Sequence, residues 1–127
     1  PLHRYQSMSP ETGVAVTTAS YQRLAANVKH GILVDCIGLR QYAAAKGFQE
    51  VLLVNSSGLV SEGAFSSVAV FDEAGGWAFP HPVTHGCLPG LTVRWFQHWL
   101  NSQALPWRWQ AVRPDDLALS QGAVIMS

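Results

Sequence analysis

Short runs of apolar and β-branched residues alternate with polar turns along most of the chain, which predicts a structure rich in short strands. The runs of strand length cover residues 14–19, 51–54, 59–61, 68–71, 77–79, 107–112 and 123–126. Asn, Ser and Gly in 55–58, and Asp and Gly in 72–76, are typical of tight turns. We therefore expect 68–71 and 77–79 to pair as a hairpin.

Longer segments have apolar residues at helical spacing instead. Residues 32–46 form the first, and Gly47 follows where a glycine favours the left-handed conformation that ends a helix. Residues 92–102 form the second. Pro114, followed by two acids, opens a short third helix. Polar loops are expected over 1–10 and 80–90. Together the elements predict a mixed α/β (α+β) domain.

The composition fits a single domain with a hydrophobic core. The chain has 127 residues, 48% hydrophobic and 13% charged, and its eight basic residues balance eight acidic ones. This balance, without a Lys/Arg cluster, argues against a nucleic acid or an anionic membrane as the main partner. No apolar run approaches the ~20 residues of a membrane-spanning helix. Cys36 and Cys87 are too few for a disulfide framework, so we expect a reduced, cytoplasmic setting.

The two ends of the sequence suggest that more chain exists. The sequence begins with Pro1 instead of Met, and it stops directly after the apolar run 123–126. Such a run is typical of a strand that leads into further structure. We therefore expect residues 1–127 to be one domain of a longer protein.

Lys29 is the first candidate for chemistry, because the chain has only one other lysine, Lys46. It follows a small, polar stretch, 25–28, and precedes His30. A single lysine is usually a solvated surface charge. A partly buried lysine can instead have a lowered pKa and form a Schiff base with a carbonyl group.

A second candidate group lies in residues 58–67, where a turn and a strand lead to Glu62, Gly63 and two serines. Glu62 taken alone is more typical of a solvated carboxylate than of a functional one. Gly63 is expected at a bulge or at a close approach of the backbone to another group.

The third candidate group, residues 87–92, immediately precedes the second predicted helix. Backbone N–H groups at a helix start, together with the Thr92 hydroxyl, form an anion site. The alternative is that Thr92 only caps the helix. Taken alone, the segment favours neither interpretation.

Two further patterns favour structural roles. His81, His85 and Cys87 are of metal-ligand type, but Pro82 disrupts a regular helical His-x-x-x-His face and no fourth ligand is evident, so we predict loop residues and no metal site. The tryptophans at 95 and 99 lie on one side of the second predicted helix. Aromatic side chains at this spacing more often fill a core or a subunit interface than an exposed recognition face.

The three candidate groups occur in a characteristic order: Val28-Lys29, then Gly58-x-Val60-x-Glu62-Gly63-x-x-Ser66, then Leu88-Pro89-Gly90-x-Thr92. This ordered set resembles the C-terminal, cofactor-binding domain of class IV aminotransferases, the fold-type IV enzymes that use pyridoxal 5′-phosphate (PLP). The family includes branched-chain and D-amino-acid aminotransferases and aminodeoxychorismate lyase. The resemblance implies that residues 1–127 form the C-terminal pseudo-barrel domain of the D-amino-acid-aminotransferase-like fold.

The resemblance also implies roles for individual residues. Lys29 would form the Schiff base with PLP and then move the proton between the substrate carbon and the cofactor. Glu62 would pair with the pyridine nitrogen and keep it protonated, which makes the ring a better electron sink. Leu88 would pack on the face of the ring.

The phosphate of PLP would bind at the start of the second helix. The resemblance assigns it the backbone amides of Leu91 and Thr92 and the Thr92 hydroxyl, with Ser66 and Ser67 at the border. The chain departs from the family at two of these places. Ser67 stands where the family often has Asn, and Val93 stands where it often has Arg, with Arg94 one position later.

The function implied is that of an aminotransferase, which exchanges an amino group between an amino acid and a 2-oxo acid. The alternatives are a lyase of the aminodeoxychorismate type, which releases pyruvate, or a non-catalytic domain that kept the fold. The family is usually homodimeric. Its smaller N-terminal domain, which supplies an arginine to the phosphate and part of the substrate pocket, has no counterpart in this sequence.

Overall fold

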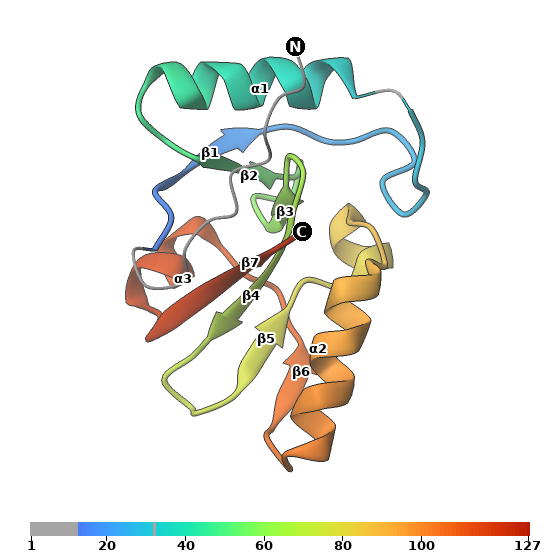
Figure 1. The fold of residues 1–127 in the computed structure, drawn as a ribbon, viewed down its shortest axis with the longest axis vertical. Coiled ribbons are helices and arrows are strands. Elements are labelled where there is room, and N and C mark those ends of the chain that lie inside the picture. The colour runs from blue at the N-terminus through green and yellow to red at the C-terminus, as the bar shows by residue number, and fades with distance from the viewer. Residues whose placement is uncertain (1–12, 32) are drawn as a thin grey trace.

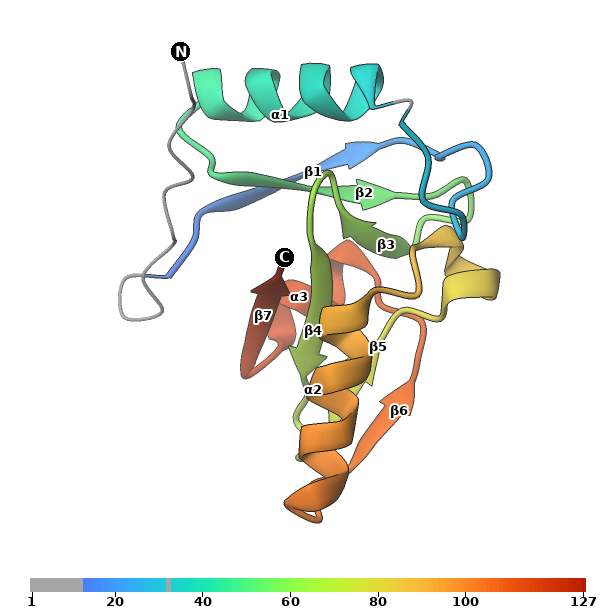
Figure 2. The same cartoon turned by 45° about the vertical axis from the view of Figure 1, so that its right-hand side comes forward.

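Two sheets form the centre of the molecule, and a helix covers the outer face of each (Figures 1 and 2). This arrangement comes from a computed structural model that describes residues 13–31 and 33–127. The loop expected over 1–10 lies outside the described residues. The layers run in the order helix, three-stranded sheet, four-stranded sheet, helix.

The three-stranded sheet has the order β1-β2-β3. Its strands are β1 (Val16–Ser20), β2 (Glu50–Val54) and β3 (Val60–Gly63). β1 and β2 are parallel because helix α1 (Val34–Ala45) connects them, whereas the tight turn at 55–58 makes β2 and β3 antiparallel. Gly47 follows α1 with φ +86° and the backbone hydrogen bonds of a Schellman motif, which confirms the predicted helix end.

The four-stranded sheet has the order β6-β5-β4-β7. Its strands are β4 (Ser67–Phe71), β5 (Trp77–Phe79), β6 (Trp107–Trp109) and β7 (Gly122–Met126). β4 and β5 form the predicted hairpin, β7 pairs antiparallel with β4, and β6 pairs parallel with β5. Arg108 on β6 forms an ion pair with Asp72 in the hairpin turn.

Three further helical segments complete the described chain. They are the single π-helical turn η1 (Pro82–Gly86), α2 (Leu91–Ser102) and α3 (Pro114–Leu119). α2 lies along the outer face of the four-stranded sheet (Figure 2). Among the described residues, no helix has the length and apolar character needed to cross a membrane.

Alternation of side chains along the strands distributes the apolar residues over three clusters. On β2, Val51 and Leu53 pack in the cluster that includes α1 residues, while Leu52 between them packs with the second sheet. β4 does the same from the other side, with Val68 toward the first sheet and Ala69 toward α2. The continuous apolar runs of these two strands follow from burial on both faces.

One predicted strand is shorter than expected. The apolar pattern predicted a strand over 107–112, but β6 ends at Trp109. The N–H group of Gln110 makes one more bond to β5, and the chain then leaves that strand, so that the carbonyl of Val112 accepts a hydrogen bond (2.8 Å) from Val60 of β3. Residues 110–112 therefore cross from one sheet to the other.

Gly63 ends β3 at a place where no side chain fits, which confirms the predicted close approach. A Cβ atom there would collide with the Ser66 hydroxyl and lie 3.2 Å from both the Glu50 carboxyl carbon and the Ser66 carbonyl oxygen. The Ser66 hydroxyl donates to Glu50 (2.8 Å), a buried carboxylate that also forms an ion pair with Arg40 (3.3 Å). The Ser66–Glu50–Arg40 network therefore has room only because residue 63 is a glycine.

We expect Gly63→Ala to destabilise the fold by about 1–3 kcal/mol, the usual range for overpacking a core, because the new methyl group displaces the Ser66 hydroxyl from Glu50. Gly38→Ala is the matched control: Gly38 is exposed within α1 with open space around its Cβ position, and the change should stabilise by about 1 kcal/mol. Urea unfolding measures both. Equal effects of the two changes would contradict the proposed collision.

Candidate active site

One cavity of about 640 Å³ is lined by all the residues that the sequence analysis assigns to a cofactor. They are Lys29, Glu62, Ser66, Ser67, Leu88, Leu91 and Thr92. They come from the loop between β1 and α1, from β3, from the end of the β3–β4 connection with the first residue of β4, and from the segment that leads into α2 with its first turn. The cavity thus lies where the edge of the first sheet meets the start of α2.

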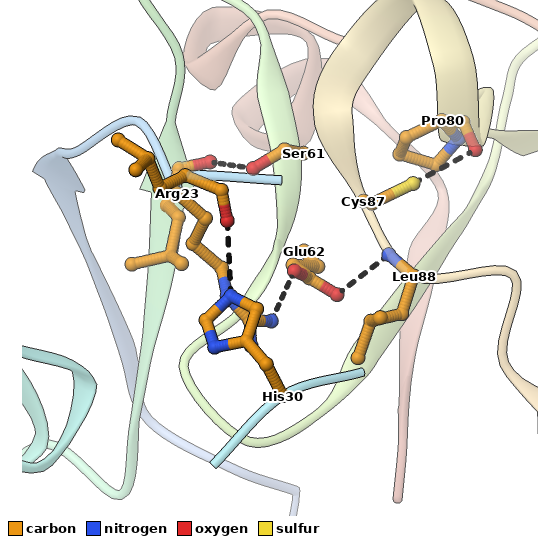
Figure 3. A network of polar contacts seen from close by, with 9 residues as sticks. Arg23, His30, Ser61, Glu62, Pro80, Cys87 and Leu88 are labelled. Carbon is orange, nitrogen blue, oxygen red and sulfur yellow. Dashed lines mark hydrogen bonds and ion pairs between the residues drawn. The ribbon is translucent and has the colours of Figure 1, made fainter. Parts of the chain in front are cut away.

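Glu62 is the buried acid of this cavity, with 3% of its surface exposed. Arg23, which is 8% exposed, donates to Oε1 at 2.6 Å, and the backbone N–H of Leu88 donates to Oε2 at 3.1 Å. Figure 3 shows these two donors on either side of the carboxylate. Each carboxylate oxygen has a second lone pair, so the group can accept a further hydrogen bond.

Burial raises the pKa of Glu62 above its ordinary value, because a charged carboxylate loses its hydration in the interior. The Leu88 amide and the Arg23 guanidinium act in the opposite direction and lower the pKa in part. The Arg23 guanidinium at 2.6 Å and the Leu88 amide replace part of the hydration that the carboxylate loses on burial.

Lys29 lies in the loop between β1 and α1, in the wall of the cavity and exposed to solvent. The next residue, His30, has its Nε2 atom 2.9 Å from the carbonyl oxygen of Leu24, which closes the loop on itself (Figure 3). Arg23 belongs to the same loop, so its ion pair with Glu62 ties the segment that carries Lys29 to strand β3.

The start of α2 has no side-chain cap. The N-cap residue is Gly90, and no side chain accepts a hydrogen bond from the first turn. Thr92 is the second helical residue, and its hydroxyl donates to the carbonyl of Ser127 at 3.0 Å. The interpretation of Thr92 as a helix cap is therefore wrong. The first backbone N–H groups of α2 have no intrahelical acceptor and are left for an anion or for water.

The two serines differ in what their hydroxyls do. The buried Ser66 donates to Glu50, so its hydroxyl already has a partner outside the cavity lining. Ser67 lies against the start of α2, since a Cβ added to Gly90 would come within 3.3 Å of the Ser67 oxygen. Of the two, Ser67 is the one placed to contact a group at the helix start.

Several residues that line the cavity could not be assigned to it from sequence, above all Arg23, His30, Met126 and Ser127. Arg23 carried no pattern of its own; its only signal is that a buried acid at Glu62 requires a cation nearby. For Met126 and Ser127 the sequence indicated only the end of a predicted strand and not a place in the cavity. They reach the cavity because β7 pairs with β4 and ends beside α2.

The residues His81, His85 and Cys87 hold the loop around η1 together. The His81 ring nitrogen accepts from the first turn of η1 at 3.2 and 3.4 Å, and the His81 N–H donates to the His85 ring at 2.6 Å. The Cys87 thiol donates to the carbonyl of Pro80, and burial raises its pKa to about 12. Within the described ranges, no group of three His, Cys, Asp or Glu residues is arranged to hold a metal ion.

The family model for class IV amino-transferases matches residues 1–127, the whole of the sequence. The chain belongs to the class IV aminotransferase family. No curated protein sequence matches the chain significantly. The match to the family model, together with the two sheets and their covering helices, confirms the mixed α/β class and the resemblance on which the sequence analysis relied.

Solved structures of class IV aminotransferases have the same fold. A hypothetical aminotransferase from Mycobacterium tuberculosis in its PLP-bound form superposes with a TM-score of 0.83 at 24% identity, over 91% of this chain and 44% of that one. The branched-chain aminotransferase of Thermoproteus uzoniensis with norvaline gives 0.83 at 22% identity, over 91% and 40%. A putative 4-amino-4-deoxychorismate lyase from Legionella pneumophila gives 0.80 at 16% identity, over 88% and 42%. This chain spans less than half the length of each of these proteins.

We expect Arg23→Leu to destabilise this aminotransferase domain by about 3–5 kcal/mol at neutral pH, because it leaves the buried Glu62 carboxylate without its cation. Loss of the cation raises the pKa of Glu62 further. The folded variant then binds a proton that the unfolded chain releases, so its stability decreases as the pH rises through the raised pKa. Urea unfolding between pH 5 and 8 measures this slope.

The matched control is the double variant Arg23→Leu/Glu62→Gln, which leaves no unpaired charge at this position. It should regain most of the lost stability and show no comparable pH slope. A double variant as unstable as Arg23→Leu alone would mean that Arg23 acts through packing and not through its charge.

Proposed function

We propose that this chain is the cofactor-binding part of a PLP-dependent aminotransferase that exchanges an amino group between an amino acid and a 2-oxo acid. The observation that carries the proposal is the single cavity in which a lysine, a buried ion-paired carboxylate and an uncapped helix start lie together. Family membership supports the same chemistry.

These groups fit the chemical features of PLP one by one. The Lys29 amine would bind its aldehyde carbon, and the Glu62 carboxylate has a free lone pair for the protonated ring nitrogen. The N–H groups at the start of α2 would bind its phosphate. When bound, PLP supplies an electron sink that stabilises negative charge on the substrate carbon.

The side chains of this chain would carry out the proton transfers and hold the ring in place. The Lys29 nitrogen would take the proton from the substrate carbon and deliver it to the cofactor, and it would carry a proton in the opposite direction when the 2-oxo acid is converted. Glu62, whose carboxylate accepts hydrogen bonds from Arg23 and the Leu88 amide, would hold a proton on the ring nitrogen. The half-buried side chain of Leu88 lines the cavity beside this carboxylate and provides an apolar face for a flat ring.

The phosphate position requires one local change in hydrogen bonding. Thr92 donates its hydroxyl proton to the Ser127 carbonyl, and it can donate to a phosphate oxygen only after leaving that acceptor. The backbone amides of Leu91 and Thr92 need no such change. The amides are therefore the permanent part of the phosphate site, and the hydroxyl is added on binding.

The substrate pocket and the active assembly involve more than this chain. Because the structural neighbours are more than twice as long, we propose that a further domain completes the pocket. We also propose that the protein is a homodimer. The exposed Trp95 (65%) and Trp99 (41%) on α2 support burial of this helix face against another chain or domain. Sedimentation of the whole protein measures the number of chains in the assembly.

The free thiols of Cys36 and Cys87 support a cytoplasmic location, which fractionation of the cells would test.

Borohydride reduction of the PLP-loaded protein tests the proposal. We expect a phosphopyridoxyl label on Lys29 and none on Lys46, which lies outside the cavity with its ammonium group 4.3 Å from the centre of the Tyr42 ring. Peptide mapping by mass spectrometry locates the label. Lys29→Arg should abolish labelling and amino transfer, whereas Lys46→Arg should preserve both.

Labelling of Lys46, or equal labelling of both lysines, would overturn the proposed role of Lys29. Label on Lys29 with pyruvate release in the absence of any 2-oxo acid acceptor would favour the lyase alternative. Label on Lys29 with neither activity in the whole protein would favour a non-catalytic domain that retains the cofactor.

We expect Thr92→Val to weaken PLP binding about 10- to 100-fold, because a hydrogen bond to a charged group contributes about 1.5–3 kcal/mol. Ser102→Ala, at the other end of the same helix and also removing one hydroxyl, is the control and should leave the affinity unchanged. Equilibrium dialysis against PLP measures both constants. Equal affinities of the two variants would exclude the Thr92 hydroxyl from the phosphate site.

A further inference from the structure

A second, smaller cavity adjoins the first. Its volume is about 250 Å³, and it shares Glu62, Ser67, Leu88 and Pro89 with the larger cavity. Its other walls come from β5, β6, η1 and α2. A volume of this size corresponds to about eight water molecules, or to an organic molecule of about ten non-hydrogen atoms.

Gln97 gives this cavity an unusual polar group. Its side chain lines the cavity from α2, is only 7% exposed, and has an Nε2 atom without a hydrogen-bond partner among the described residues. A buried amide without a partner costs about 1–3 kcal/mol. A donor of this kind points to an acceptor that the chain itself does not supply.

Arg94 lies one turn before Gln97 on the same face of α2, at the same cavity. It is exposed, and it has no ion-pair partner in the part of the chain that the structure describes. Val93, the residue before Arg94, is buried against the second sheet. Arg94 itself lines the small cavity and is not among the residues that line the large one.

The rest of the cavity is apolar and uncharged on the side away from Glu62. Phe79, Val93 and Trp109 form its walls, with the Phe79 and Trp109 rings edge to face at 6.2 Å. The Cys87 thiol is neutral, because its pKa is about 12. Glu62, the acid in the wall, is already bonded to Arg23 and to the Leu88 amide.

We propose that this cavity is a binding site for a small monocarboxylic acid with an aromatic or branched aliphatic body, separate from the proposed cofactor site. The carboxylate would lie between Arg94 and the Gln97 amide, which donate to its oxygens. The body would pack on Phe79, Val93 and Trp109, away from the Glu62 carboxylate. The site does not depend on the proposed aminotransferase activity.

The probe for the test is 4-fluorophenylacetate, observed by its fluorine NMR linewidth on titration of the whole protein without PLP. We expect a dissociation constant on the order of 1 mM or lower, as for a small ligand with few contacts. Gln97→Leu and Arg94→Gln should each raise it at least tenfold. The neutral analogue 4-fluorophenylacetamide should bind at least tenfold more weakly than the acid.

Matched controls separate this site from the cofactor cavity and from general surface charge. Gln103→Leu, directly after the same helix, and Arg113→Gln, which line neither cavity, should leave binding unchanged. Lys29→Ala should also leave it unchanged, since Lys29 lines only the large cavity. Because Gln97→Leu removes an unpaired buried amide, it should unfold at the same temperature as the parent protein or higher.

Three outcomes would overturn the proposal. Absence of binding at 10 mM probe would mean that the cavity holds only water. Loss of binding in Lys29→Ala, with binding retained in Gln97→Leu, would place the probe in the large cavity. Equal binding of the acid and the amide would exclude the carboxylate recognition assigned to Arg94. None of these results would bear on PLP binding, which the labelling of Lys29 tests separately.

Discussion

The buried ion pair between Arg23 and Glu62 is the interaction on which the candidate site depends. A carboxylate that is 3% exposed is unfavourable in a protein interior unless a cation or hydrogen-bond donors compensate for its lost hydration. Here Arg23 and the Leu88 amide supply that compensation. They come from two segments that have no sheet hydrogen bonds to β3, so the same contacts that stabilise the charge also fix the loop of Lys29 and the approach to α2.

The layered fold explains why these segments meet. Strands β2 and β4 are buried on both faces, and their alternating side chains hold the two sheets against each other and against α1 and α2. β3 and β4 are close in sequence but belong to different sheets, so the segment between them lies at the junction of the sheets. Gly63 at this junction leaves the room that Ser66 and Glu50 occupy.

Much of the fold could be predicted from the sequence because it depends on local patterns. The apolar run of β2, the hairpin turn between β4 and β5 and the glycine after α1 are all signals within a few residues. The early end of β6 could not be predicted, because it depends on a hydrogen bond from Val60, far away in the chain. The π-helical turn η1 likewise depends on hydrogen bonds from backbone N–H groups to the ring nitrogens of two histidines, within a loop that has no periodic pattern.

The candidate site likewise has some residues that local motifs predict and others that only tertiary contacts determine. The ordered motifs around Lys29, Glu62 and Thr92 named residues that the fold brings to one cavity. Arg23 could not be found from sequence, because a partner of a buried charge is determined by tertiary contact and not by spacing. The same holds for the hydroxyls: nothing in the sequence indicates that Ser66 is hydrogen-bonded to Glu50, or that Thr92 is hydrogen-bonded to Ser127 directly after β7.

Burial of the Arg23–Glu62 pair has a consequence for how the protein responds to dissolved salt. Mobile ions weaken attraction between charges that water surrounds, but they cannot enter a dry interior. The Arg108–Asp72 pair, whose arginine side chain is 41% exposed, is open to this screening, whereas the side chains of Arg23 and Glu62 are 6% and 3% exposed. Rising ionic strength should therefore loosen the hairpin end of the second sheet while the loop that carries Lys29 stays in place.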